Sequence, residues 1–150
     1  MIKIKKPRKK RLNLEEKEQM ALIEWAHLHD DIWPYLIHIR NEGKRSKAEG
    51  AKAKRMGLMK GVSDLFLAKP TRIRLVDELL SEETKKVGCI VINYSGFWIE
   101  LKSKHGKPTN HQLNFLDKMK LERYKAAIFY SWTDAAKAIC EYLGKDTHGL

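Results

Sequence analysis

The fold of this chain is restricted most by residues 97–102, which read FWIELK. Aromatic and β-branched residues favour a β-strand, in which successive side chains point to opposite faces of the sheet. One face then carries Phe97, Ile99 and Leu101, and the other carries Trp98, Glu100 and Lys102. A carboxylate and an ammonium therefore lie side by side, roughly 7 Å apart between their Cα atoms. Taken alone, this arrangement is typical of a solvated ion pair on an exposed sheet face.

The hydrophobic periodicity of the whole chain predicts a mixed α/β domain, in which a few strands form one sheet and helices pack around it. Residues 41–46 are polar and contain glycine, so we expect a loop there, and we find no repeat and no second domain. The predicted helices are residues 14–29, 48–56, 75–83, 109–122 and 133–143, and the predicted strands are residues 35–39, 65–68, 89–93, 97–102 and 126–130.

The charge of the chain is strongly positive and unevenly spread. The 150 residues, enough for one domain with one core, carry a formal net charge of +11, which indicates an anionic partner such as nucleic acid or a membrane surface. Seven lysines and arginines lie within the first eleven residues, with no acidic residue among them. We therefore divide the chain into a flexible basic arm (1–12), a folded domain (13–144) and a C-terminal tail (145–150).

Several other classes of protein do not fit the sequence. No apolar run is long enough to span a bilayer or to act as a signal peptide, and the basic arm lacks the apolar face that a membrane-surface protein needs. Cys89 and Cys140 form no CxxC motif, and the six histidines show no zinc-ligand spacing. We expect an intracellular, cytoplasmic protein with reduced, packed cysteines and no membrane partner.

Asp64 is the second acidic residue of interest, because it follows Gly61 and stands at the start of the predicted strand 65–68. Taken alone, it is typical of an aspartate that caps a turn. If this strand lies beside strand 97–102, however, Asp64 and Glu100 can converge on one hard cation. Magnesium prefers oxygen ligands and usually takes only one or two carboxylates, with water and phosphate completing its shell. Lys102 would then lie beside that water and that phosphate.

Glu18 lies on the apolar stripe of the first predicted helix, together with Leu14, Leu22 and Trp25. An acid on a buried face needs a cation or hydrogen bonds, so Glu18 is a candidate for the same site. The alternative is a partly exposed acid at the edge of the helix. Glu15 and Glu16 are less well placed on the stripe.

Gln112 lies on the apolar stripe of helix 109–122 and is therefore expected to face the sheet. The alternative is a capping box, in which Thr109 is the N-cap and Gln112 is the third helical residue. Both roles could hold together.

At this point the residues resemble the VRR-NUC family of virus-type nuclease domains, within the PD-(D/E)xK nuclease superfamily. The resemblance covers roughly residues 15–143 and rests on the order and spacing of short motifs. These are Glu18-Gln19 in the first helix, Asn41-Glu42-Gly43-Lys44-Arg45, Gly57 with Gly61-Val62-Ser63-Asp64, Trp98-Ile99-Glu100-Leu101-Lys102-Ser103, and Gln112. Two features depart from the family: it usually has proline where Ser63 stands, and the stretch between Pro70 and Gly96 is longer.

The resemblance implies a restriction-endonuclease-like core, with a small mixed sheet flanked by helices. It implies that Asp64, Glu100 and the backbone carbonyl of Leu101 ligate Mg²⁺, for which Mn²⁺ can substitute, with Glu18 nearby. Lys102 would orient or activate the attacking water, and Gln112 would support the site. The implied reaction is hydrolysis of a phosphodiester bond in DNA, in which a bound metal lowers the pKa of water from about 15.7 towards neutrality.

The implied substrate is branched DNA, since stand-alone members of this size resemble Holliday-junction resolvases, including those of viruses acting in a host cell. We expect a symmetric homodimer, with the apolar residues of 71–96 as its interface or packed on their own domain. The alternatives are a nuclease of flaps or other branched DNA, and a non-catalytic DNA-binding module. The expected DNA contacts are Lys5, Lys6, Arg8, Lys9, Lys10, Arg11, Lys44, Arg45, Lys60 and Lys104.

Overall fold

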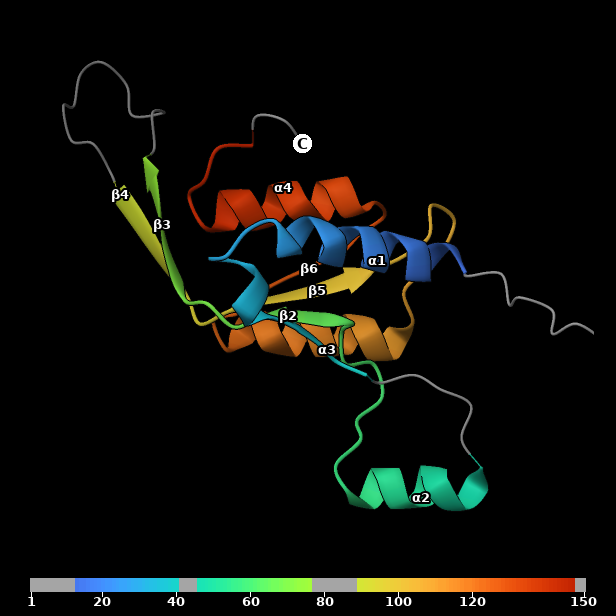
Figure 1. Cartoon of the computed structure of the whole chain (residues 1–150). Coiled ribbons are helices and arrows are strands. Elements are labelled where there is room, and N and C mark those ends of the chain that lie inside the picture. The colour runs from blue at the N-terminus through green and yellow to red at the C-terminus, as the bar shows by residue number, and fades with distance from the viewer. Residues whose placement is uncertain (1–12, 41–45, 77–88, 148–150) are drawn as a thin grey trace, which may run out of the picture.

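The structure is a computed structural model that describes residues 13–40, 46–76 and 89–147. It has the mixed α/β architecture that the periodicity predicts (Figure 1). None of the described helices is long and apolar enough to cross a membrane. The elements in chain order are α1 (Leu14–His27), the 3₁₀ helix η1 (Trp33–Tyr35), β1 (Leu36–His38), α2 (Lys47–Arg55), β2 (Leu65–Leu67), β3 (Thr71–Val76), β4 (Cys89–Tyr94), β5 (Phe97–Leu101), α3 (Asn110–Leu121), β6 (Lys125–Phe129) and α4 (Trp132–Tyr142).

The main sheet has four strands in the order β1-β2-β5-β6. β2 pairs antiparallel with both β1 and β5, and β5 pairs parallel with β6 after the crossover through α3. Figure 1 shows α1 and α4 together on one face of this sheet and α3 on the other. The sheet is therefore mixed and flanked by helices on both faces, and β5 is one of its two central strands.

The two faces of β5 are both buried, and their composition differs as the alternation predicts. Its apolar face packs into the main core against residues of α1 and α4. On the other face, the ring of Trp98 meets Phe115 of α3 edge-on, with 5.0 Å between the ring centroids. Glu100 and Lys102 lie on this second face and are buried as well. The pair of Glu100 and Lys102 is therefore buried. This rules out the alternative considered from the sequence, a solvated ion pair on an exposed sheet face.

Side-chain caps explain where the helices begin. Asn13, Ser46 and Thr109 each accept a hydrogen bond from the backbone of the third helical residue, whose Glu or Gln side chain bonds back to the backbone of the cap. Ser131 caps α4 through the backbone of Asp134. These contacts satisfy amide groups that a helix leaves without partners at its start. The N-cap predicted at Thr109 is confirmed.

Two elements project from the body of the domain in Figure 1: α2, and the hairpin formed by β3 and β4. No residue of α2 is buried. The hairpin strands pair along their whole length, from Thr71 opposite Tyr94 to Val76 opposite Cys89, and form a separate two-stranded sheet. The base of the hairpin is held by Tyr94, whose ring centroid lies 6.0 Å from that of Tyr142 in α4.

The largest difference from the predicted elements falls in this hairpin. The predicted helix 75–83 is wrong at its start, because residues 75 and 76 belong to β3, and residues 77–88 lie outside the described part of the chain. Pairing with β4 overrides the local helical pattern there. In addition, α1 ends at His27 rather than at residue 29, and Tyr35 belongs to η1 rather than to β1. The basic arm and most of the predicted loop 41–46 also lie outside the described residues.

Candidate active site

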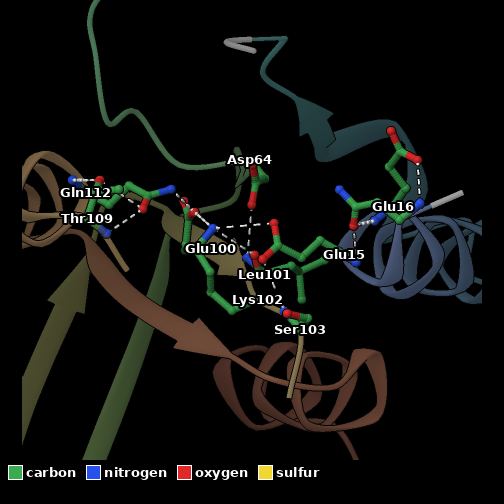
Figure 2. A network of polar contacts seen from close by, with 10 residues as sticks. Glu15, Glu16, Asp64, Glu100, Leu101, Lys102, Ser103, Thr109 and Gln112 are labelled. Carbon is green, nitrogen blue, oxygen red and sulfur yellow. Dashed lines mark hydrogen bonds and ion pairs between the residues drawn. The ribbon is translucent and has the colours of Figure 1, made fainter. Parts of the chain in front are cut away.

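The pairing of β2 with β5 brings Asp64 and Glu100 together. The register sets Leu65 opposite Ile99, so the next position along each strand places Asp64 across from Glu100. The Asp64 Oδ2 atom accepts a hydrogen bond of 3.0 Å from the backbone N–H of Leu101. Figure 2 shows the side chain of Asp64 pointing towards the end of β5, where Glu100 and Lys102 lie. The predicted adjacency of the two acidic residues is therefore present in the fold.

Glu100 is fully buried, with none of its surface exposed. Its Oε1 atom accepts a hydrogen bond from Gln112 Nε2 and lies 2.6 Å from Lys102 Nζ. A buried carboxylate is costly unless it is both paired with a cation and hydrogen-bonded. These two partners meet that condition, and they hold the carboxylate in one orientation.

Gln112 owes its position to the capping box of α3. Its Oε1 atom accepts hydrogen bonds from the backbone N–H of Thr109, at 2.8 Å, and from the Thr109 hydroxyl, at 3.0 Å. The Nε2 atom is thereby directed to Glu100, so both of the roles considered for Gln112 hold together. Gly61 lets the chain approach this helix start, because it has φ of +80° and a Cβ atom there would collide with the backbone of His111.

Lys102 is 6% exposed, and its ammonium lies between acidic groups. Besides its contact with Glu100, the Nζ atom donates a hydrogen bond of 3.2 Å to the carbonyl oxygen of Leu101. Burial alone would lower the pKa of Lys102, but the hydrogen bond and charge of Glu100, with smaller contributions from Glu15 and Asp64, outweigh it and raise the pKa. Lys102 is therefore an ammonium at neutral pH.

The acid that α1 contributes to this cluster is Glu15. Its Oε1 atom accepts a hydrogen bond of 3.3 Å from the backbone N–H of Ser103, and its Oε2 atom lies 3.9 Å from Lys102 Nζ. Glu18 instead uses its Oε2 atom to accept a hydrogen bond of 2.7 Å from the backbone N–H of Trp132, at the start of α4. This bond joins Glu18 to a helix terminus that has free amide groups, and its expected role at the site stays a prediction.

The sequence offers little signal to distinguish these two acids. Glu15 and Glu18 are three residues apart on α1 and so lie on nearly the same face of the helix. Only Glu15 lies in the first turn, which reaches the end of β5, whereas Glu18 lies one turn further along. The distinction depends on how far α1 slides along the sheet, and periodicity carries no information about that.

A cavity of about 220 Å³ opens beside the cluster. Asp64, Leu101 and Glu15 line it, so two carboxylates of the cluster border the same space. This volume is several times the roughly 30 Å³ that one water molecule takes up in the liquid. The cavity can therefore hold an ion together with its bound water. The other lining residues, from the start of α1 and from β1 onward, are Asn13, Glu16, Gln19, His38, Ile39 and Arg40.

The atoms gathered here fit a hard divalent cation. Asp64, Glu100 and the Leu101 carbonyl are all oxygen donors, which Mg²⁺ prefers. Among the described residues, no three His, Cys, Asp or Glu side chains form a ready metal cluster, so an ion at this site would depend on two carboxylates. The Lys102 ammonium already contacts Glu100 and the Leu101 carbonyl. Two of the three candidate ligands thus accommodate a positive charge in the structure itself.

The predicted DNA contacts can be placed only in part. Lys60 and Lys104 are both exposed. Lys60 precedes Gly61 in the segment that leads to Asp64, and Lys104 follows closely after Lys102, so both are near the cluster in sequence. The remaining predicted contacts, in the basic arm and at Lys44 and Arg45, lie outside the described residues.

Comparison with known proteins gives a match among solved structures. No protein-family model matches the chain, and no curated protein matches it. A solved structure described as a VRR_NUC domain protein superposes with a TM-score of 0.65 at 20% sequence identity, covering 89% of this chain and 91% of that one. The likeness extends over almost the full length of both. The chain therefore has the fold of a VRR_NUC domain protein, a restriction-endonuclease-like α/β core, as its motifs predicted.

Proposed function

We propose that this protein is a metal-dependent DNA endonuclease that hydrolyses phosphodiester bonds. One observation carries the proposal: Asp64, immediately before β2, lies opposite Glu100 of β5, with the Lys102 ammonium beside Glu100 and a cavity at the border of the cluster. Two acids and a lysine in this arrangement suit attack on a phosphate, whose negative charge needs cations close by. The fold shared with a VRR_NUC domain protein supports the same reaction.

Asp64, Glu100 and the carbonyl of Leu101 would hold the magnesium ion in this proposal. When bound, such an ion lowers the pKa of water and offsets charge on the phosphate. The protein's own part is to fix the two carboxylates. The Leu101 N–H holds Asp64, and Gln112 holds Glu100, so both acids are oriented before substrate arrives.

Lys102 contributes a positive charge to the proposed reaction. Because its pKa is raised by Glu100 and the neighbouring acids, it stays protonated at neutral pH. It can therefore donate hydrogen bonds to the attacking water or to a phosphate oxygen, whereas acting as a base would first require loss of its proton. Glu15 is a positioning residue for this ammonium, because it contacts Lys102 and anchors the backbone of Ser103.

Cleavage of a DNA panel in magnesium and in EDTA tests the proposal. We expect the wild type to cut only with magnesium, and Asp64→Asn to lose cleavage while it still binds DNA. Asp30→Asn, which changes an exposed acid outside the cluster, is the matched control and should cut normally. Binding without cleavage in every metal tested would favour the non-catalytic DNA-binding module instead.

For the substrate, we propose branched DNA cut by a homodimer in the manner of a Holliday-junction resolvase. One catalytic cluster cuts one strand, and a C₂ dimer supplies two clusters that match the symmetry of a four-way junction. The projecting β3–β4 hairpin supports a dimer, because Val91 is exposed and a second copy could cover it. Light scattering, with cleavage of a four-way junction, a flap and a plain duplex, tests this. A monomer that prefers flaps would contradict the resolvase proposal but not the nuclease proposal.

A further inference from the structure

Helix α2 has no role in the site described above, yet its composition is unusual for a surface helix. It reads KAEGAKAKR and carries four cations against one acid. None of its residues is buried, and it stands clear of the body of the domain in Figure 1. A helix of this length is marginal in water unless something packs against it. The described chain supplies little such packing.

The cations of α2 occupy one face of the helix. At about 100° per residue, Lys47, Lys52, Lys54 and Arg55 fall within roughly 160° of arc. Between them lie Ala48 and Ala51, which are small and exposed. The one acid of the helix, Glu49, lies outside this arc. One exposed face of the helix is therefore basic and, apart from the cations, free of bulky side chains.

The helix dipole explains only part of this charge distribution. Cations in the last turn, such as Lys54 and Arg55, are favoured by the partial negative charge at a helix C-terminus. Lys47 lies in the first turn, where the same dipole disfavours a cation. In addition, none of the four cations forms an ion pair with another described residue. The four cations are therefore available to contact an anionic partner.

We propose that the basic face of α2 lies in the major groove of duplex DNA beside the cleavage site; this inference rests on the proposed function. The major groove is about 12 Å wide and admits one α-helix, and small alanines between the cations allow close approach. Arg55 and Asp64 are nine residues apart, so their Cα atoms are separated by at most roughly 30 Å. The contacted duplex therefore lies within about one DNA turn, some 34 Å, of the cluster.

A charge-removing variant of the full-length protein tests the proposal. Lys47→Gln, Lys54→Gln and Arg55→Gln are combined, and binding to a short DNA duplex is measured in EDTA at several salt concentrations. We expect the Kd to rise about tenfold or more, and the slope of log K against log salt to flatten by about 2 to 3, since each lost phosphate contact accounts for roughly 0.9. The cleavage rate at saturating DNA should change less than twofold.

Two matched variants accompany it. Lys118→Gln, Lys120→Gln and Lys137→Gln remove the same charge from exposed positions on α3 and α4, and should leave the Kd within twofold. Exchanging Lys and Arg at the three α2 positions keeps the charge and should retain binding. Circular dichroism and thermal melting should match the wild type for every variant, because no changed residue is buried.

The outcomes separate this inference from the proposed function. Equal losses in the α2 and control variants would mean a general charge effect and would overturn the α2 contact, as would an unchanged Kd. An equal loss on duplex RNA, whose narrow major groove excludes a helix, would overturn the groove placement. If wild type binds DNA through α2 but never cleaves, the proposed function and the placement beside a cleavage site both fail, while the contact between α2 and the major groove stands.

Discussion

The cluster at the end of β5 and the helix α2 both concentrate charged side chains, but the central pair of the cluster is buried, whereas the charged side chains of α2 are exposed. In the cluster, Glu100 and Lys102 are buried and contact each other, and Gln112 and Glu15 hold them further. On α2, the cations are exposed and have no ion-pair partner among the described residues. The comparison indicates that the charges of the cluster serve the chemical step, whereas those of α2 serve binding to a partner.

This difference predicts different consequences of substitution. A change in the cluster removes a group whose neighbours are fixed around it, so it should alter the chemical step and also the stability of the fold. A change on α2 removes a charge that no side chain depends on, so it should alter affinity alone. Substitutions in the two regions test whether their charges differ in this way.

The largest effect is expected for Glu100→Gln. It removes a proposed metal ligand, and the loss of several kcal/mol of charge stabilisation corresponds to at least about 10³-fold in cleavage rate. DNA affinity should stay the same or increase, since one negative charge is gone. Single-turnover cleavage and a binding titration measure both, with Glu24→Gln, an exposed acid of α1, as the control. Cleavage at the normal rate in magnesium would show that Glu100 is only a structural group.

Lys102→Ala should lower cleavage by about 10²- to 10³-fold, in the range seen when one group that stabilises transition-state charge is lost. Metal binding should survive, because the ammonium is not a ligand. The variant should melt at a lower temperature in EDTA, since Glu100 is left buried without its cation, and magnesium should restore part of that loss. Calorimetric titration decides the role: a loss of metal binding as severe as in Asp64→Asn would contradict it. Lys118→Ala, which changes an exposed lysine of α3, is the control.

Deleting residues 1–11 should weaken DNA binding and flatten its salt dependence, as the charge of the arm predicts. Each phosphate contact that is lost lowers the slope by roughly 0.9 for B-DNA, and seven cations lie in the deleted segment. Binding titrations at several salt concentrations measure this, and melting temperature should be unaffected. An unchanged slope would assign the DNA contacts to α2 and the body of the domain alone.

Glu15→Gln and Glu18→Gln form a matched pair on one helix. Glu15→Gln should slow cleavage several-fold with little change in melting temperature, because Glu15 positions Lys102. Glu18→Gln should cost about 1 to 2 kcal/mol of stability, because it weakens a charge-assisted bond to the start of α4, and should leave the cleavage rate unchanged. Cleavage kinetics and thermal melting of both variants test this pair. If Glu18→Gln slowed cleavage and Glu15→Gln lowered only stability, Glu18 rather than Glu15 would belong to the site.

The smallest effect concerns Tyr142, a buried polar group away from the cluster. Its hydroxyl donates a 2.6 Å hydrogen bond to the Lys69 carbonyl, and burial, with a smaller contribution from Tyr94, raises its pKa from 10.0 to about 12. The protonated form is favoured in the folded state, so this stabilisation is complete below pH 10 and is lost as the pH rises towards 12. Tyr142→Phe should cost about 1 kcal/mol at pH 8.

Melting curves between pH 8 and 12 test the Tyr142 prediction through the difference between wild type and variant. That difference should shrink above pH 10, because only the wild type loses this contribution there. Groups that do not interact with Tyr142 contribute equally to both curves and cancel. A constant difference would mean that Tyr142 ionises no differently in the folded and unfolded states. Cleavage at neutral pH should be the same in both proteins. The buried hydroxyl of Tyr142 would then contribute to stability alone, unlike the buried groups of the cluster.

Much of the fold and of the candidate site followed from the sequence by itself, because local rules determine those features. The alternation of residues 97–102 set the faces of β5, and the capping pattern at Thr109 set the start of α3 and the orientation of Gln112. The turn at Gly61 set the start of β2 next to Asp64. Each of these depends on residues within a few positions of each other, where backbone geometry and hydrogen bonding leave few alternatives.

Only the tertiary structure decided the rest, because it depends on contacts between distant segments. The choice of Glu15 over Glu18 depends on where α1 lies along β5, some 85 residues further on. The strand at residues 75 and 76, where a helix was predicted, exists because β4 pairs with it. The burial of the Glu100–Lys102 pair follows from the packing of the sheet and helices around it, which no short sequence pattern encodes.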